Sequence, residues 1–216
     1  MSDSPAVEPG PAVEPEPAVA ESLFGEGIDR ARAFAADLGA RGETLGLIGP
    51  LELPRLWTRH IVNCVLPAPL FTAGSTVADI GSGAGLPGIV LSIARPDVHF
   101  TLIEPMERRI AWLDEQVSLL SLSNVTVQRA RAQEATGTYD VVTARAVSAL
   151  SKLIPMTVPL ARSGGRLIFM KGANAEAEIT AAAKSIARYR LADVSVSVLG
   201  DSPGVEPTRV ITARVS

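Results

Sequence analysis

The sequence of 216 residues has one cysteine, two histidines and an aromatic content of only 4%. The single cysteine, Cys64, excludes an internal disulfide and a thiolate-rich zinc site, as is typical of proteins from a reducing compartment. His60 and His99 are too few for a histidine-based metal cluster, so no metal site is predicted. The few aromatic residues also argue against a platform on which nucleobases stack, and Trp57 and Trp112 are expected in the core.

Long hydrophobic runs are absent as well. No window approaches the roughly 18 consecutive apolar residues that suggest a membrane span. The N-terminus lacks the basic start and apolar run of a signal peptide. We therefore expect a cytoplasmic protein with no membrane association. Because 47% of the residues are hydrophobic, the chain can bury one sizeable core, and one folded domain is predicted.

Basic residues are missing from residues 1–21, which repeat the run Pro-Ala-Val-Glu-Pro and hold five of the 23 acidic residues. This composition predicts a disordered tail over residues 1–21. The tail also hides the charge of the remaining chain. Residues 22–216 carry 20 basic and 18 acidic side chains, a net charge of +2 that is compatible with a phosphate-rich ligand.

The hydrophobic spacing divides residues 22–216 into two parts. Residues 22–70 have helical spacing interrupted by glycine and proline, which predicts a helical N-terminal lobe. From residue 71 strands and helices alternate, which predicts an α/β core with a mostly parallel sheet and helices on both faces. The last two strands have no helix between them and should pair antiparallel. The expected strands are 76–80, 99–104, 125–128, 139–144, 166–170, 193–199 and 209–215, and the expected helices are 86–95, 107–120, 150–161 and 174–188.

The most informative motif is the run from Val77 to Gly85, in which an apolar strand leads into Gly81, Gly83 and Gly85. Helical spacing resumes at Leu86, so the glycines lie where a strand passes into a helix N-terminus. Without side chains at three positions, a ligand can reach the backbone N–H groups directly. The motif therefore predicts a nucleotide-binding turn.

Two cofactors fit this turn. The spacing Gly83-x-Gly85-x-x-Gly88 matches a dinucleotide fingerprint, and Glu104 ends the next strand, where it can accept ribose hydroxyls. These features alone suit NAD and S-adenosylmethionine equally. Asp79 favours S-adenosylmethionine, because a carboxylate repels pyrophosphate and attracts an ammonium and a sulfonium.

Two further observations favour S-adenosylmethionine. Little sequence remains for the separate substrate domain of a dehydrogenase. Ala132 and Gln133 follow the third strand, where they can contact an adenine. An NAD(P)-dependent oxidoreductase remains the alternative from another enzyme class.

The segment after the fourth core strand restricts the methyl acceptor. Thr143-Ala144-Arg145-Ala146 stands where enzymes that methylate exocyclic amines carry an Asn/Asp-Pro-Pro-aromatic run. Cytosine-C5 methylation requires a cysteine nucleophile. The only cysteine, Cys64, is expected in the helical lobe, away from the strand ends. A cation near the reaction centre suits an electron-rich ring nitrogen such as guanine N7. A methyltransferase for small molecules or proteins, and a noncatalytic RNA-binding module, remain open.

Five motifs together resemble the bacterial 16S ribosomal RNA guanine-N7 methyltransferase family, the RsmG/GidB type, over about residues 23–215. The Gly-Leu-Pro-Gly extension of the glycine run and the Arg-Ala pair after the fourth strand are the most specific of them. The motifs are Arg59-His60, residues 79–88, residues 104–109, residues 144–146 and Lys171-Gly172.

The resemblance implies a Rossmann-like, S-adenosylmethionine-dependent enzyme, acting as a monomer, that methylates N7 of one guanine in 16S rRNA, with the 30S subunit as its expected partner. The family's cofactor contacts correspond to Gly81, Leu86, Ala132, Gln133 and Arg145. Many family members have an acidic residue where this chain has Gln133, and Lys-Arg where it has Arg108-Arg109.

Several cations could form a basic rim that binds RNA phosphates, because the strand ends and the helical lobe should converge at the site. Arg145 and Lys171 are candidate catalytic residues, since both lie at strand ends where α/β proteins bind ligands. The role of His60 rests on the family resemblance. The predicted rim consists of Arg55, Arg59, His60, Arg108, Arg109, Arg145 and Lys171.

Overall fold

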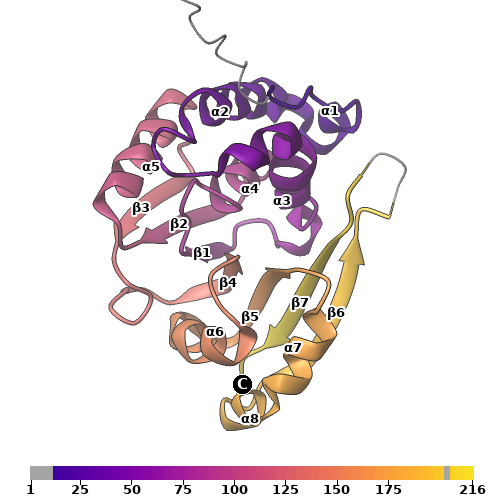
Figure 1. Cartoon of the computed structure of the whole chain (residues 1–216). Helices are drawn as coiled ribbons and strands as arrows, with labels where there is room; N and C mark the ends of the chain where they lie inside the picture. The colour runs from indigo at the N-terminus through magenta and orange to yellow at the C-terminus, as the bar shows by residue number, and fades with distance from the viewer. Residues whose placement is uncertain (1–11, 202–204) are drawn as a thin grey trace, which may run out of the picture.

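The computed structural model describes residues 12–201 and 205–216, and its centre is a seven-stranded sheet of order β3-β2-β1-β4-β5-β7-β6 (Figure 1). β1 to β5 pair in parallel, whereas β7 is antiparallel to both β5 and β6. This arrangement confirms the predicted α/β fold, with β7 inserted between β5 and the edge strand β6. The strands are β1 (Thr76–Ile80), β2 (His99–Glu104), β3 (Val125–Arg129), β4 (Tyr139–Arg145), β5 (Ala161–Lys171), β6 (Ala192–Leu199) and β7 (Thr208–Arg214).

Helices precede the sheet and connect its strands. The α-helices are α1 (Val19–Phe24), α2 (Ile28–Arg41), α3 (Asn63–Val65), α4 (Gly88–Ala94), α5 (Glu107–Leu119), α6 (Leu150–Thr157), α7 (Ala175–Ala181) and α8 (Ala183–Arg188). Short 3-10 helices span Gly25–Gly27, Pro50–Arg55, Ala68–Leu70 and Val158–Leu160, and a π-helical segment, η3, spans Leu56–Val62. Among the described residues, no helix combines the length and apolarity that crossing a membrane requires.

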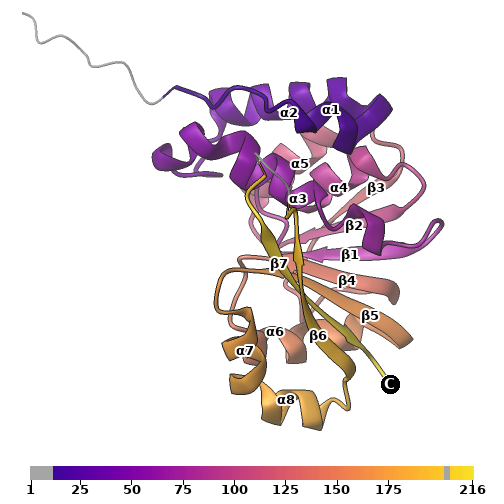
Figure 2. The same ribbon diagram turned by 90° about the vertical axis from the view of Figure 1, so that its right-hand side faces the viewer.

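Successive side chains of the strands point to opposite faces of the sheet and build two cores. Val77 belongs to a core shared with the N-terminal helices, α4 and α5, whereas its neighbour Ala78 belongs to a core under α6, α7 and α8. Figure 2 shows the sheet between these two helical layers. The N-terminal helices therefore cover one sheet face instead of forming a separate body.

The boundary predicted for the disordered tail, residue 21, lies too late in the chain. Residues 1–11 lie outside the described residues, but residues 12–21 pack on the lobe, and α1 begins at Val19. The N–H of Glu14 donates to the Leu53 carbonyl at 2.9 Å, and Glu16 accepts two hydrogen bonds from Arg32 at 2.7 and 2.9 Å. The acidic residues of this segment thus find partners on the lobe that composition alone does not reveal.

Most predicted elements differ from the observed bounds by one or two residues at an end, and three differ more. The helix expected over residues 150–161 ends at Thr157, a 3-10 turn follows, and β5 begins at residue 161 instead of 166. The helix expected over residues 174–188 is two helices separated at Ala182, which is fully buried and has ψ near 4°. This break allows both short helices to pack against α6.

Candidate functional site

The glycine turn joins β1 to α4 at the carboxyl edge of the sheet. Gly81, Gly83 and Gly85 have φ values of +68°, +55° and +93°, which side chains disfavour. Space is also limited, since a Cβ on Gly85 would lie 2.5 Å from Ile89 Cγ1, and one on Gly81 would lie 2.9 Å from Val147 Cγ2. Backbone conformation therefore favours glycine at all three positions, and packing favours it at Gly81 and Gly85 as well.

Asp79 lies beneath this turn and is fully buried. Its Oδ2 accepts the N–H of Gly88, the first residue of α4, at 3.1 Å, while Oδ1 has no hydrogen-bond partner among the described residues. Burial raises the pKa of Asp79 to about 7, and the nearby Glu104 charge adds to this effect. Direct contact between Asp79 and a cofactor stays a prediction. In the structure the carboxyl group positions the turn through the Gly88 N–H.

Glu104 ends β2 and is 2% exposed. Its Oε2 accepts the N–H of Gly83 and its Oε1 the N–H of Met106, both at 3.0 Å. Arg109 Nη1 lies 3.8 Å from Oε2. Each carboxylate oxygen keeps a lone pair beyond these bonds, so Glu104 can still accept a ribose hydroxyl at the edge of the glycine turn.

The remaining predicted cofactor residues lie at the same edge of the sheet. Leu86 is half-buried beside the turn, where its N–H donates to the Ser82 carbonyl at 3.1 Å. Ala132 and Gln133 lie in the turn after β3, with Ala132 half-buried and Gln133 exposed. The structure thus brings the ends of β1, β2 and β3 together, as the sequence predicts for a cofactor site.

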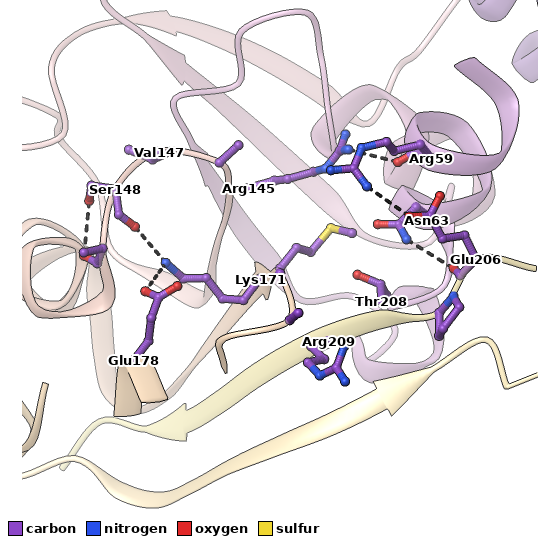
Figure 3. Close-up of a pocket in the computed structure, with 16 residues that line it drawn as sticks. Arg59, Asn63, Arg145, Val147, Ser148, Lys171, Glu178, Glu206, Thr208 and Arg209 are labelled. Atoms are coloured by element: carbon purple, nitrogen blue, oxygen red, sulfur yellow. Dashed lines mark hydrogen bonds and ion pairs between the residues drawn. The ribbon is translucent and has the colours of Figure 1, made fainter. Parts of the chain in front are cut away.

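A cavity of about 900 Å³ lies at the ends of β4, β5 and β7 (Figure 3). Val147 lines this cavity and also lies beside Gly81, so the cavity adjoins the glycine turn. The polar and charged side chains of its lining are Arg59, Asn63, Arg145, Ser148, Lys171, Glu178, Glu206, Thr208 and Arg209.

Arg145 ends β4 and directs its guanidinium toward the N-terminal lobe. Its Nη2 donates to the Arg59 carbonyl and to His60 Nδ1, both at 2.9 Å, and its Nη1 lies 3.3 Å from Cys64 Sγ. The expectation that Cys64 lies away from the strand ends is therefore wrong. Burial raises the pKa of the Cys64 thiol to about 11, so the thiol stays protonated and is a poor nucleophile.

His60 links Arg145 to a carboxylate. Since an arginine only donates, His60 Nδ1 accepts from Arg145, and its Nε2–H donates to Glu52 Oε2 at 2.7 Å. Burial, together with the Arg145 charge, lowers the pKa of His60 and keeps the ring neutral. With both ring nitrogens bonded and the side chain 12% exposed, His60 bridges the lobe and β4. Its RNA contact stays a prediction.

Lys171 ends β5 with its side chain 9% exposed. Its ammonium donates to the Ser148 carbonyl at 2.7 Å and to Glu178 Oε2 at 2.8 Å, and that carboxylate oxygen also accepts the Leu150 N–H at 2.7 Å. Figure 3 shows Lys171 extended along the cavity wall to these partners. The charge of Lys171, one of the two candidate catalytic residues, is therefore balanced by the Glu178 carboxylate. Lys171 also holds the loop after β4 against α7.

The predicted basic rim divides into two groups. Arg59, Arg145 and Lys171 line the cavity, and Arg55 lies beside it, sharing Glu206 with Arg59. Arg108 is exposed on α5, and Arg109 lies over Glu104 on the cofactor side. Arg108 and Arg109 do not line the cavity, because α5 follows β2 and not β4 or β5.

Sequence reasoning missed several lining residues, namely Asn63, Glu178, Glu206, Thr208 and Arg209. Arg209 had a usable signal. It is the second residue of β7, after Thr208, and its antiparallel pairing with β5 places it directly opposite Lys171. Asn63, Glu178 and Glu206 come from helices and a loop, and no local sequence pattern predicts that these approach the site.

Comparison with known proteins identifies the family. Residues 28–205 match the family model GidB, described as rRNA small subunit methyltransferase G. The chain belongs to this family. The predicted family is thereby confirmed, and the protein is an S-adenosylmethionine-dependent methyltransferase.

Relatives of this family cover nearly the whole chain. The ribosomal RNA small subunit methyltransferase G of Clavibacter michiganensis subsp. michiganensis is 64% identical over 200 residues, 92% of this chain and 94% of that protein. The protein of the same name from Leifsonia xyli subsp. xyli is 57% identical over 217 residues and all of both chains.

Solved structures confirm the fold. A predicted O-methyltransferase of Agrobacterium tumefaciens superposes with a TM-score of 0.57 at 19% identity, covering 71% of this chain and 80% of that one. The N-methyltransferase NodS of Bradyrhizobium japonicum, solved with S-adenosylhomocysteine, superposes with a TM-score of 0.52 at 17% identity, covering 70% and 83%. These likenesses support the Rossmann-like methyltransferase fold.

Proposed function

We propose that this protein transfers the methyl group of S-adenosylmethionine to N7 of one guanine in 16S ribosomal RNA. The observation that carries the proposal is the shared wall between two sites. Val147 touches the glycine turn on one side and lines the 900 Å³ cavity on the other. A donor at the turn and a base in the cavity would then meet at this side chain.

The residues present fit the cofactor. The Glu104 carboxylate offers acceptors for a ribose, and Ala132 and Gln133 lie where an adenine would reach β3. The N–H groups of Gly81, Gly83 and Gly85 already donate to Ile103, Glu104 and Ser82, so what the turn offers a ligand is close approach to its backbone. When bound, S-adenosylmethionine supplies an electrophilic methyl group on a sulfonium. The roles of Gly81, Gly83, Gly85 and Leu86 in holding it belong to the same proposal.

The chemistry at N7 suits the ionisable groups of the cavity. The N7 lone pair forms the new bond to carbon while the carbon–sulfur bond breaks, so no proton must be removed and alignment is the main requirement. His60 is neutral and bonded at both nitrogens, and Glu178 is bonded to Lys171 and Leu150. Among the groups of this cavity, none needs to act as a base. Arg145 and Lys171 hold the lobe and the loop after β4 around the acceptor.

The setting of the reaction is part of the proposal. The relatives at 57 to 64% identity are named for ribosomal RNA of the small subunit. Four cations of the chain line the cavity. We infer that the protein acts as a monomer, in the cytoplasm, on 16S rRNA within the 30S subunit.

The test uses purified protein, S-adenosylmethionine labelled in its methyl group, and 30S subunits from cells that lack the modification. We expect label in 16S rRNA, at a guanine where N7 methylation makes the chain cleavable after borohydride and aniline treatment. Label in protein or in small molecules would contradict the proposal. So would calorimetric binding of NADH without binding of S-adenosylmethionine.

A further inference from the structure

The four cations that line the cavity differ in whether their N–H groups already donate hydrogen bonds to the protein. Lys171 donates to Ser148 and Glu178, and Arg145 donates to Arg59 and His60. Arg59 donates to Glu206 at 3.0 Å. Three of the four lining cations are therefore committed to groups of the protein.

Arg209 is the exception among the described residues. No hydrogen bond engages its guanidinium, and its Nε–H is buried without an acceptor. The nearest carboxylate oxygen, Glu176 Oε1, lies 3.9 Å from Nε, and the Glu176 side chain is 64% exposed. In Figure 3 no dashed line reaches Arg209, in contrast to Lys171. A buried donor without a partner is unfavourable, so an acceptor from a ligand would stabilise this arrangement.

Arg209 belongs to the lining of the acceptor cavity. Arg209 pairs with Lys171 across the antiparallel strands β7 and β5, so both side chains lie on the same sheet face. Both line the cavity. The lining holds four cations and two carboxylates, Glu178 and Glu206, and both carboxylates are already paired with cations. The cavity therefore favours an anionic group near Arg209.

We propose that Arg209 binds a backbone phosphate of the substrate RNA next to the target nucleotide and thereby positions the base. The inference rests on the proposed function. S-adenosylmethionine carries no phosphate, so a phosphate at this place must come from the acceptor. An arginine suits this task, because its planar fork can bind two phosphate oxygens at once.

The experiment compares full-length Arg209→Gln with two matched variants. Arg214→Gln removes an exposed arginine at the other end of β7, and Glu176→Gln removes the distant carboxylate without touching the cation. The measurements are KM for unmethylated 30S subunits, kcat, the affinity for S-adenosylmethionine by calorimetry, and the salt dependence of binding to a 16S rRNA fragment.

For Arg209→Gln we expect a KM for the subunit raised about tenfold, kcat within about twofold, and a salt slope reduced by about one unit, as for the loss of one phosphate contact. Affinity for S-adenosylmethionine should not change. Arg209→Lys keeps the charge but not the fork, and should retain the salt slope with a smaller rise in KM. Arg214→Gln should behave as wild type, and Glu176→Gln should bind RNA at least as well as wild type.

An unchanged KM and salt slope in Arg209→Gln would overturn the inference while leaving the proposed function intact. So would equal losses in Glu176→Gln, which would reveal an ion pair with a structural role. A loss of affinity for S-adenosylmethionine in Arg209→Gln would overturn it as well. Failure of the wild-type protein to label 16S rRNA would instead remove the proposed function, and the inference with it.

Discussion

Asp79 is a buried carboxyl group in the turn that would hold the cofactor. It has no exposed surface and a single hydrogen bond, from the Gly88 N–H. Gly88 cannot carry a side chain there, because a Cβ would lie 2.2 Å from Leu102 Cδ2 and 2.5 Å from Asp79 Oδ2. This close contact fixes the start of α4 relative to β1, at the cost of desolvating a carboxylate.

The raised pKa of Asp79 makes the stability of the protein depend on pH. An unfolded aspartate titrates near 3.9, whereas burial raises the pKa of Asp79 to about 7 in the folded chain. Between these values the native state holds a proton that the unfolded state has released, so this group lowers stability as the pH rises from about 4 to 7. We expect the free energy of unfolding of Asp79→Asn, relative to wild type, to increase over this range and then level off in urea titrations.

Asp140→Asn is the matched control. Hydrogen bonds from Thr76 and Arg162 lower the pKa of Asp140 to about 2, so its contribution is complete above the unfolded pKa and disappears only in acid. The difference in free energy of unfolding between Asp140→Asn and wild type should stay constant from about pH 5 to 8. A constant difference for Asp79→Asn as well would show that Asp79 is ionised in the native state.

At the residue scale, the sequence predicts backbone roles better than side-chain roles. The three glycines are predictable, because a local pattern of strand, glycines and helix defines their turn. The partners of Arg145 and Lys171 are not. His60 lies 85 positions from Arg145, and Ser148 lies 23 positions from Lys171, so only the assembled fold brings them together.

At the scale of elements, η3 (Leu56–Val62) depends on a cap from outside the helix. Arg55, which precedes it, provides no capping side chain. Glu14 instead accepts the N–H of Thr58 at 2.9 Å and its hydroxyl at 3.2 Å through Oε2. A carboxylate at a helix N-terminus satisfies an unpaired donor and interacts favourably with the helix dipole.

Replacing this cap should destabilise the protein. We expect Glu14→Ala to lower the free energy of unfolding by about 0.5–2 kcal/mol, the usual cost of losing a cap, and Glu14→Gln to lower it less because an acceptor remains. Urea denaturation followed by circular dichroism measures both. Glu43→Ala changes an exposed side chain that makes no hydrogen bond among the described residues, and should stay within about 0.5 kcal/mol of wild type. Equal stability of Glu14→Ala and wild type would show that the contact contributes nothing.

The core elements were predictable because each strand is an apolar run with clear ends. β1 and β2 match the predicted strands residue for residue. The elements that differ lie where long-range contacts override local pattern. The segment before α1 is acidic and rich in proline yet packs on the lobe through Glu14 and Glu16. β5 extends beyond its apolar run because its first residue, Ala161, pairs with Tyr139 at the start of β4.

At the scale of the whole molecule, the N-terminal lobe and the sheet share one core. Phe34 and Leu56 of the lobe pack in the same cluster as Phe100 and Ile168 of the sheet. Arg145 adds polar links between the lobe and β4. A lobe that depends on the sheet for its core should not unfold separately, which predicts a single cooperative transition.

The two tryptophans can test this. Trp57 lies in the lobe, and Trp112 lies on α5, where its Nε1–H donates to the Ala84 carbonyl of the glycine turn at 3.0 Å. Trp112→Phe leaves fluorescence from the lobe alone, and Trp57→Phe leaves fluorescence from beside the turn. In each variant, the urea midpoint by fluorescence should equal that by circular dichroism.

Ligand binding extends the same test. A ligand that binds only the native state, present at about 100 times its Kd, adds about 2.7 kcal/mol to the free energy of unfolding. S-adenosylmethionine should therefore raise the urea midpoint of the fluorescence transition by the same amount for Trp57 and for Trp112. NADH should change neither midpoint. The lobe would be a separate folding unit if the urea midpoint by Trp57 fluorescence were lower than that by circular dichroism. The same would follow if S-adenosylmethionine raised the midpoint by Trp112 fluorescence only. Arg145 would then link two independently stable parts around the cavity.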